Sequence, residues 1–156
     1  MVALEDDIAF LADVPTFALL GRQALRILAI GAESRNIPSG AVLFYAGDLA
    51  DCGYVVQEGS FLLEGDRPGK NDESSVGAGA LLGELALITD TVRTETATAQ
   101  EESVVIRIPR NLFLKMLEGY PEAARTLRDA MASRLSQSIE DLSGVKGKLQ
   151  SNFDER

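Results

Sequence analysis

The sequence predicts an α+β fold in which an antiparallel β-roll, of the jelly-roll or double-stranded β-helix type, is flanked by N-terminal helices and a long C-terminal helix. Two changes in the spacing of apolar residues predict it: helical spacing gives way to short runs between glycines near residue 34, and helical spacing returns after residue 108. With 156 residues, 46% of them hydrophobic, the chain is long enough to bury a core. We expect one domain over residues 1–156.

The N-terminal region, about residues 4–31, has the apolar spacing of helices. Its apolar positions are Ile8, Phe10, Leu11, Phe17, Leu20, Leu25, Leu28 and Ala29. Pro15 and Gly21 interrupt this spacing. We therefore expect two or three short helices rather than one long helix.

The middle region, about residues 34–108, consists of short strand-like runs separated by glycine turns. The runs are "AVLFYAG", "GYVVQEG", "SFLLEG", "TETATA" and "SVVIRIP". Gly40, Gly47, Gly59 and Gly79 are expected at turn positions that need positive φ, and not at ligand contacts. The polar stretch "EGDRPGKNDESS" predicts an exposed hairpin loop.

The C-terminal region, about residues 109–142, is predicted to be helical. "YPEAARTLRDAMASRLSQSIEDL" places Pro121 in a first helical turn. The apolar residues that follow are three or four positions apart: Ala124, Leu127, Met131, Leu135, Ile139 and Leu142. This pattern indicates a long amphipathic helix.

Composition excludes several classes of function. The net charge of −9, without a basic cluster, argues against direct contact with DNA. The chain has no histidine, which removes the commonest general base and transition-metal ligand, so we expect neither an enzyme nor a metal site. A sole cysteine, Cys52, excludes an internal disulfide and a thiolate zinc site, as in a reducing cytoplasm. The N-terminus is acidic where a signal peptide is basic, and no apolar run is long enough to span a membrane. We therefore expect a cytoplasmic protein that is not inserted in a membrane.

One motif indicates a binding site. Glu84, in "GALLGELAL", and Arg93, in "VRTETATA", are nine positions apart in otherwise small and apolar surroundings. With "IPSGAVLFYAGDLADCGYVVQEGSFLLEG" before them, these segments resemble the cyclic nucleotide-binding domain of bacterial catabolite activators and protein kinase A regulatory subunits. The resemblance covers about residues 10–142. "GELAL" followed by Arg and a Thr/Ala-rich strand resembles the phosphate-binding cassette of that family.

The resemblance implies a ligand, cyclic AMP or cyclic GMP, and no cofactor. Arg93 would bind the cyclic phosphate, because an Arg–phosphate contact is charge-assisted. Glu84 would bind the ribose 2′-hydroxyl, because an ionised carboxylate only accepts hydrogen bonds. The carried-over positions are Gly83, Glu84, Leu85, Ala86, Arg93 and Thr94. Gly83, Leu85 and Ala86 would act through backbone or shape, and the Thr94 hydroxyl would lie near the phosphate and, in related proteins, favours guanine.

Ligand binding would be read out by movement of the C-terminal helix. Ser138 is the expected base contact on that helix, and an effector protein, not identified by the sequence, would respond to the movement. The apolar positions of the helix also predict a homodimer, with packing on the chain's own roll as the alternative.

Three alternatives stay open. Glu84 and Arg93 would form an ordinary surface ion pair if the cassette were not a site, and Cys52 would be a redox sensor rather than a buried apolar residue. Glu95, where the family usually has a small residue, would weaken phosphate binding if it faced the ligand. In that case the domain would be a degenerate cyclic nucleotide-binding fold that only binds proteins.

Overall fold

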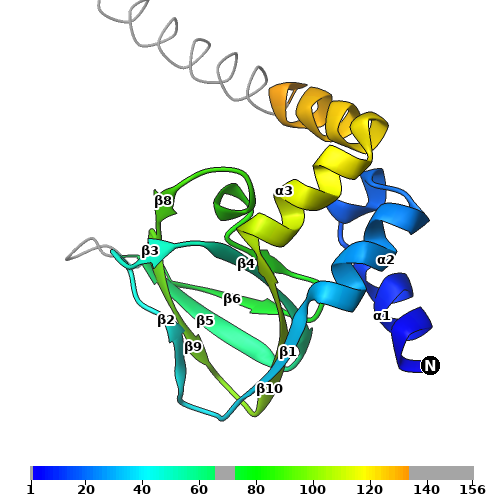
Figure 1. Cartoon of the computed structure of the whole chain (residues 1–156). Helices are drawn as coiled ribbons and strands as arrows, with labels where there is room; N and C mark the ends of the chain where they lie inside the picture. The colour runs from blue at the N-terminus through cyan, green and yellow to red at the C-terminus, as the bar shows by residue number, and fades with distance from the viewer. Residues whose placement is uncertain (1, 66–72, 134–156) are drawn as a thin grey trace, which may run out of the picture.

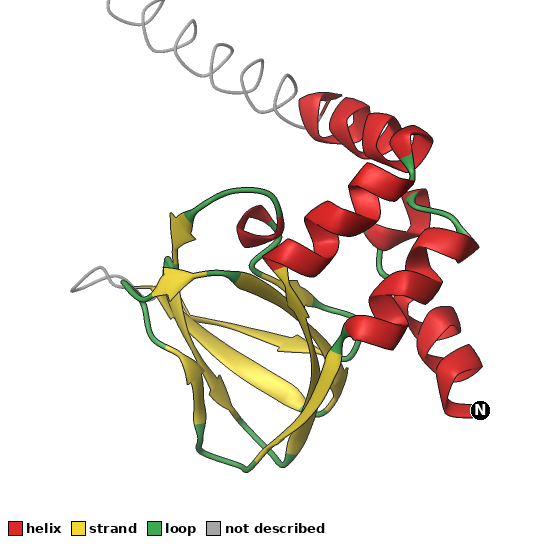
Figure 2. Cartoon of the chain, in the orientation of Figure 1, coloured by secondary structure: helices red, strands yellow, loops and turns green. Residues whose placement is uncertain are grey.

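The computed structural model describes residues 2–65 and 73–133, and it confirms the predicted α+β fold: helices gather on one side of an antiparallel β-roll (Figures 1 and 2). The N-terminal elements are α1 (Val2–Ala12), a 3₁₀ turn η1 (Phe17–Leu19) and α2 (Arg22–Gly31). After the roll come α3 (Arg110–Gly119) and a helix over residues 121–133. Pro121 is the first residue of that last helix, as predicted.

The roll consists of two four-stranded sheets and a two-stranded ribbon, all antiparallel. The first sheet, in the order β1-β10-β4-β7, contains β1 (Glu33–Ile37), β10 (Ser103–Pro109), β4 (Cys52–Glu58) and β7 (Leu81–Leu82). The second sheet, in the order β2-β9-β5-β6, contains β2 (Val42–Phe44), β9 (Glu95–Ala99), β5 (Ser60–Gly65) and β6 (Glu73–Gly77). The ribbon pairs β3 (Leu49–Ala50) with β8 (Thr91–Val92).

Strand β4 is buried on both faces, and it separates two apolar cores. Because side chains alternate along a strand, Tyr54 and Val56 point into the roll while Val55 packs against the helices. The helical core continues through Phe17 and Phe113, whose ring centroids are 6.2 Å apart. The roll therefore has an interior of its own, and the helices of the described part of the chain cover the roll on one side.

The structure differs from the sequence expectations at the hairpin. "EGDRPGKNDESS" was expected to be loop throughout, but its two ends belong to β5 and β6, with Glu64 paired to Glu73. The polar strand β1 and the two-residue strands were missed because none shows a run of alternating apolar residues. The predicted positive φ is confirmed at Gly40, Gly47, Gly59 and Gly79.

Part of the predicted C-terminal helix lies outside the described residues. This applies to Ser138 and Ile139, and to Leu135 and Leu142, which together with Met131 predict a homodimer; of these positions only Met131 is described. Cys52, in contrast, is confirmed as a buried apolar residue, with 2% of its surface exposed.

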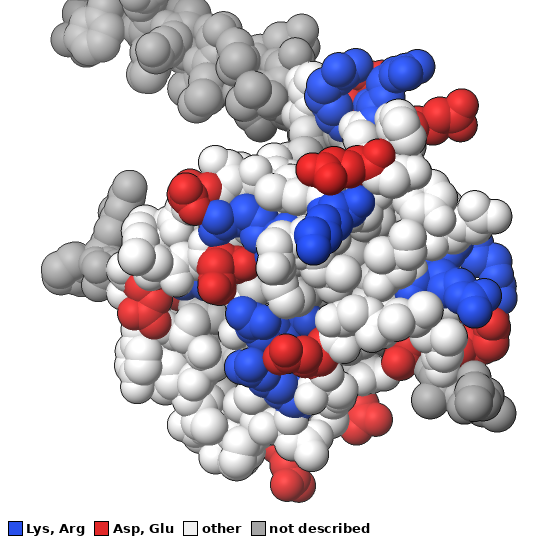
Figure 3. Space-filling model, viewed as in Figure 1, with Lys and Arg blue, Asp and Glu red and all other residues white. Residues whose placement is uncertain are grey.

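Charges on the viewed face are mixed. Figure 3 shows Lys and Arg side chains lying next to Asp and Glu side chains. Ion pairs among the described residues include Arg35 with Glu33 at 3.1 Å, Arg107 with Asp51 at 3.6 Å, and Arg110 with Asp90. None of the helices among the described residues is long and apolar enough to cross a membrane.

Replacing Gly59 by Ala should destabilise the fold. Gly59 has φ +91°, and a Cβ there would lie 2.8 Å from the Cα of Ser103. We expect Gly59→Ala to lower the free energy of unfolding by about 2–4 kcal/mol, measured by urea denaturation. Gly77→Ala is the control, because its Cβ would meet only the Gly59 carbonyl oxygen at 3.8 Å. A loss within about 0.5 kcal/mol is expected there, and equal losses in both variants would contradict this account.

Candidate functional site

Six of the seven residues predicted from the sequence line one pocket of about 350 Å³ on the roll. They are Gly83, Glu84, Leu85, Ala86, Arg93 and Thr94. The seventh, Ser138, lies outside the described residues. The structure thus brings the two halves of the motif together, from η2 (Leu85–Leu87) and from the segment between β8 and β9.

The backbone of Arg93 is held by a tight turn over residues 45–48. The Gly47 N–H donates to the Arg93 carbonyl at 2.7 Å, and the Arg93 N–H donates to the Asp48 carbonyl at 2.8 Å. The turn is closed by the Asp48 carboxylate, which accepts from the Tyr45 N–H, and Gly47 takes φ +92°. A turn that needs a glycine therefore fixes where the Arg93 side chain begins.

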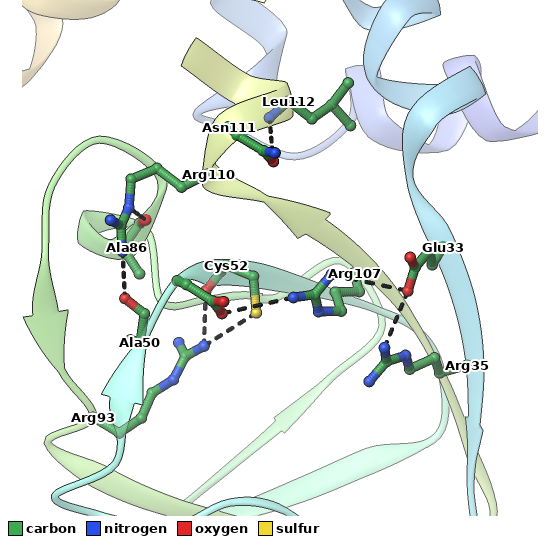
Figure 4. A network of polar contacts seen from close by, with 11 residues as sticks. Glu33, Arg35, Ala50, Cys52, Ala86, Arg93, Arg107, Arg110, Asn111 and Leu112 are labelled. Atoms are coloured by element: carbon green, nitrogen blue, oxygen red, sulfur yellow. Dashed lines mark hydrogen bonds and ion pairs between the residues drawn. The ribbon is translucent and has the colours of Figure 1, made fainter. Parts of the chain in front are cut away.

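The Arg93 side chain is buried without a balancing charge at its hydrogen-bond partners. Only 7% of its surface is exposed, and Nη2 donates to the Cys52 carbonyl at 2.8 Å and contacts the Cys52 Sγ at 3.4 Å (Figure 4). Nη1 has no hydrogen-bond partner among the described residues. The alternative of a surface ion pair with Glu84 does not fit an arginine buried to this extent.

Two aromatic rings support the guanidinium. Its carbon lies 4.4 Å from the Phe44 ring centroid and 5.5 Å from that of Tyr54, within cation–π range. Burial, reinforced by a hydrogen bond with Cys52, raises the pKa of Tyr54, so its ring stays a neutral phenol beside the cation. The rings hold the guanidinium in place and leave its charge unneutralised.

Position 83 requires a glycine for two reasons, its backbone conformation and its closeness to Arg93. Its φ is +82°, and a Cβ there would lie 2.2 Å from Arg93 Nη1. Pairing of β7 with β4, with Leu82 opposite Tyr54, brings Gly83 beside Cys52. The unpartnered nitrogen therefore faces a stretch of backbone that carries no side chain.

Glu84 is only partly exposed, and its Oε2 accepts a hydrogen bond of 2.5 Å from the Thr16 hydroxyl. Thr16 precedes η1 and is itself 6% exposed. Sequence analysis missed this contact, because nothing local marks a threonine 68 positions away as the partner of Glu84. The N-terminal helices are therefore linked directly to the cassette.

The predicted short helix of the cassette is the 3₁₀ turn η2. Within it the Ala86 N–H donates to the Gly83 carbonyl at 3.1 Å, and the Ala86 side chain is fully buried. Leu85 is 52% exposed at the pocket. In this conformation Ala86 contributes shape to the pocket, and its amide is used within the turn.

Thr94 and Glu95 complete the pocket wall, and the structure settles which way Glu95 faces. On β9, Glu95 shares its face with Ala97 and Ala99, both buried in the roll, since the three residues are two apart. Glu95 is half-buried and lines the pocket together with Arg93. Thr94 is exposed at the same wall.

Arg110, the first residue of α3, ties the pocket to the C-terminal helices. Its Nε donates to the Ala86 carbonyl at 2.9 Å, its Nη2 to the Ala50 carbonyl at 2.6 Å, and its Nη1 pairs with Asp90 (Figure 4 shows the two carbonyl contacts). Ala50 and Ala86 both line the pocket. One guanidinium therefore fixes two pocket-wall segments to the start of α3.

Removing the hydrogen bonds of Arg110 to the Ala86 and Ala50 carbonyls should destabilise the domain. Arg110→Met leaves two partly buried carbonyls without their donor, and we expect the free energy of unfolding to fall by about 2–3 kcal/mol in guanidinium chloride. Arg22→Met is the matched control, because Arg22 pairs with Glu5 at the surface, with their side chains 70% and 56% exposed. A change of about 0–1 kcal/mol is expected there. If Arg110→Met is no more harmful than the control, Arg110 does not anchor the pocket.

Comparison with known proteins gives one family. The model of the "Cyclic nucleotide-binding domain" matches residues 34–120. A cyclic nucleotide-binding-like protein from Brucella abortus is 42% identical, with a TM-score of 0.63, over 72% of this chain and 98% of that one. The N-terminal domain of a transcriptional regulator from Streptomyces coelicolor is 31% identical, with a TM-score of 0.77, over 85% of this chain and 94% of that one.

A different kind of relative is an uncharacterised NTE family protein of Mycobacterium tuberculosis, 33% identical over 128 residues, or 82% of this chain. This chain spans 8% to 22% of the length of such NTE-type relatives, which include fungal lysophospholipases. The match of fold and family model leads to one conclusion: the chain belongs to the cyclic nucleotide-binding domain family, whose domains are regulatory modules.

Proposed function

We propose that the chain, taken as one unit over residues 1–156, is a cyclic nucleotide sensor that binds its ligand in the cassette pocket and signals through its C-terminal helices. One observation carries the proposal: Arg93, a residue only 7% exposed, lines the pocket, and its Nη1 has no hydrogen-bond partner among the described residues. A buried charged donor left unsatisfied costs about 1–3 kcal/mol or more. An anion in the pocket removes that cost.

The anion that suits the pocket carries a hydroxyl nearby. Glu84 accepts a hydrogen bond from the Thr16 hydroxyl at 2.5 Å, and an ionised carboxylate offers only acceptors. A ribose 2′-hydroxyl next to a cyclic phosphate would use Glu84 in the same way as Thr16 does. Free inorganic phosphate has no such group, and it would also meet the negative charge of Glu84.

The apolar part of the pocket suits a purine. Phe44, Leu63, Val76 and Leu82 line it alongside the polar residues. Base and ribose phosphate would therefore bind to different parts of one pocket, and Thr94 would add a hydroxyl near the phosphate.

The signal would leave the pocket through Arg110. Its bonds to Ala86 and Ala50 connect the pocket wall to α3, so a shift of η2 on binding would move the helices that follow. Contact of Ser138 with the base, a homodimer through the C-terminal helix and a cytoplasmic location stay predictions. The lysophospholipase relatives suggest a hydrolase of that class as the effector, on the same or another polypeptide.

Titration calorimetry of nucleotide-stripped protein with cyclic AMP and cyclic GMP tests ligand binding. We expect micromolar affinity, about −8 kcal/mol, for one of the two nucleotides, and millimolar or weaker binding of inorganic phosphate. Absence of heat and of thermal stabilisation with both nucleotides would contradict the sensor, and would favour the protein-binding alternative.

Arg93→Met should separate binding from folding. Methionine keeps an unbranched stem against Phe44 and removes the charge, so we expect nucleotide affinity to fall at least about 100-fold, with unfolding in urea changed by about 1 kcal/mol or less. Arg107→Met is the matched control, since Arg107 is 18% exposed and lies outside the pocket. Unchanged affinity in Arg93→Met would place the phosphate elsewhere.

We also propose that the chain does not hydrolyse its ligand. It contains no histidine, and no group of three or more acidic or cysteine side chains that could hold a metal occurs among the described residues. Incubation with excess cyclic nucleotide should leave it intact by chromatography. Accumulation of the linear monophosphate, lost in Glu84→Gln, would contradict this.

A further inference from the structure

We propose that Glu95 is a specificity-determining residue and that it makes the pocket select cyclic GMP over cyclic AMP. This inference rests on the proposed function of the pocket and names its ligand. Glu95 lines the pocket two positions after Arg93, the residue that would bind the phosphate. Because a carboxylate repels an anionic ligand, Glu95 in this position needs a favourable contact with another part of the ligand.

The register of the second sheet places Glu95. Strand β9 pairs with β5 without a bulge, so that Ala99 lies opposite Phe61, Ala97 opposite Leu63 and Glu95 opposite Gly65. Phe61, Leu63, Ala97 and Ala99 are all buried inside the roll. Glu95 is the next inward-facing position along this face, and opposite it Gly65 has no side chain to fill the space.

The neighbours of Glu95 on this face are apolar. Leu63 lines the pocket and lies diagonally across from Glu95, two residue pairs along the strands and on the same face. In the part of the chain that the structure describes, no hydrogen bond or ion pair of Glu95 is seen, whereas Glu84 and Arg93 both have hydrogen-bond partners. Glu95 therefore presents an acceptor beside the apolar wall that would hold the base.

The chemistry of the purines decides which base fits. An ionised carboxylate offers only acceptors. Guanine carries two donors on one edge, the N1–H and the 2-amino group, and these match the two oxygens of a carboxylate. On the same edge adenine has an N1 lone pair between its 6-amino group and C2–H, so that lone pair would face a negative oxygen. The pairing with guanine is charge-assisted and excludes adenine by repulsion.

The test is calorimetry with cyclic GMP, cyclic AMP and cyclic IMP on the wild-type chain and on Glu95→Gln. The wild type should bind cyclic GMP at least about tenfold more tightly than cyclic AMP. Cyclic IMP, which keeps N1–H but lacks the 2-amino group, should fall between them. A glutamine side chain offers an amide donor to adenine N1 and a carbonyl acceptor to the adenine 6-amino group. Glu95→Gln should therefore lower the affinity for cyclic GMP about tenfold or more, and it should raise the affinity for cyclic AMP.

Glu64→Gln is the control, because Glu64 is exposed on β5, opposite Thr96, and its substitution changes the net charge equally. It should leave the ratio of the two affinities unchanged. If Glu95→Gln raises the affinity for both nucleotides by the same factor, Glu95 only repels the phosphate. In that case the inference about base selection fails, while the proposed sensor function is still supported. If neither nucleotide binds either protein, the proposed function fails and the inference with it.

Discussion

The candidate site is built around one buried cation. Arg93 is packed against Phe44 and Tyr54, bonded to Cys52 and closely approached by Gly83, yet Nη1 has no hydrogen-bond partner among the described residues. A domain that keeps a guanidinium in this state gives up stability when its pocket is empty. That free energy becomes available to an anionic ligand, because binding satisfies a donor that the fold has already positioned.

The elements around the pocket explain how binding would reach the rest of the chain. Glu84 contacts Thr16 of the N-terminal segment, and Arg110 bonds two carbonyls of the pocket wall from the first turn of α3. Both helical regions are thus attached to the pocket by polar contacts rather than by apolar packing alone. Hydrogen bonds of defined geometry have discrete alternatives, so under the proposed function a ligand that replaced one of them would shift the balance between helix positions.

Much of the fold was predictable from the sequence, because apolar spacing and glycine turns are local signals. The five principal strand runs and the four positive-φ glycines were found in this way. The cassette residues followed from the family resemblance, and they line one pocket. The partners of Arg93 and Glu84 were not predictable, since Cys52 lies 41 positions from Arg93, and Thr16 68 positions from Glu84. The orientation of Glu95 required the register of β9 against β5, which a short Thr-rich strand does not reveal.

The most direct test of the account observes the guanidinium itself. Side-chain ¹H–¹⁵N spectra would be recorded during titration with cyclic GMP, with the Arg93 signals assigned by their loss in Arg93→Met and the Arg107 signals as an internal reference. We expect a selective shift of the Arg93 signals that saturates with the same affinity as calorimetry gives. Saturable binding that leaves the Arg93 signals in place would contradict it.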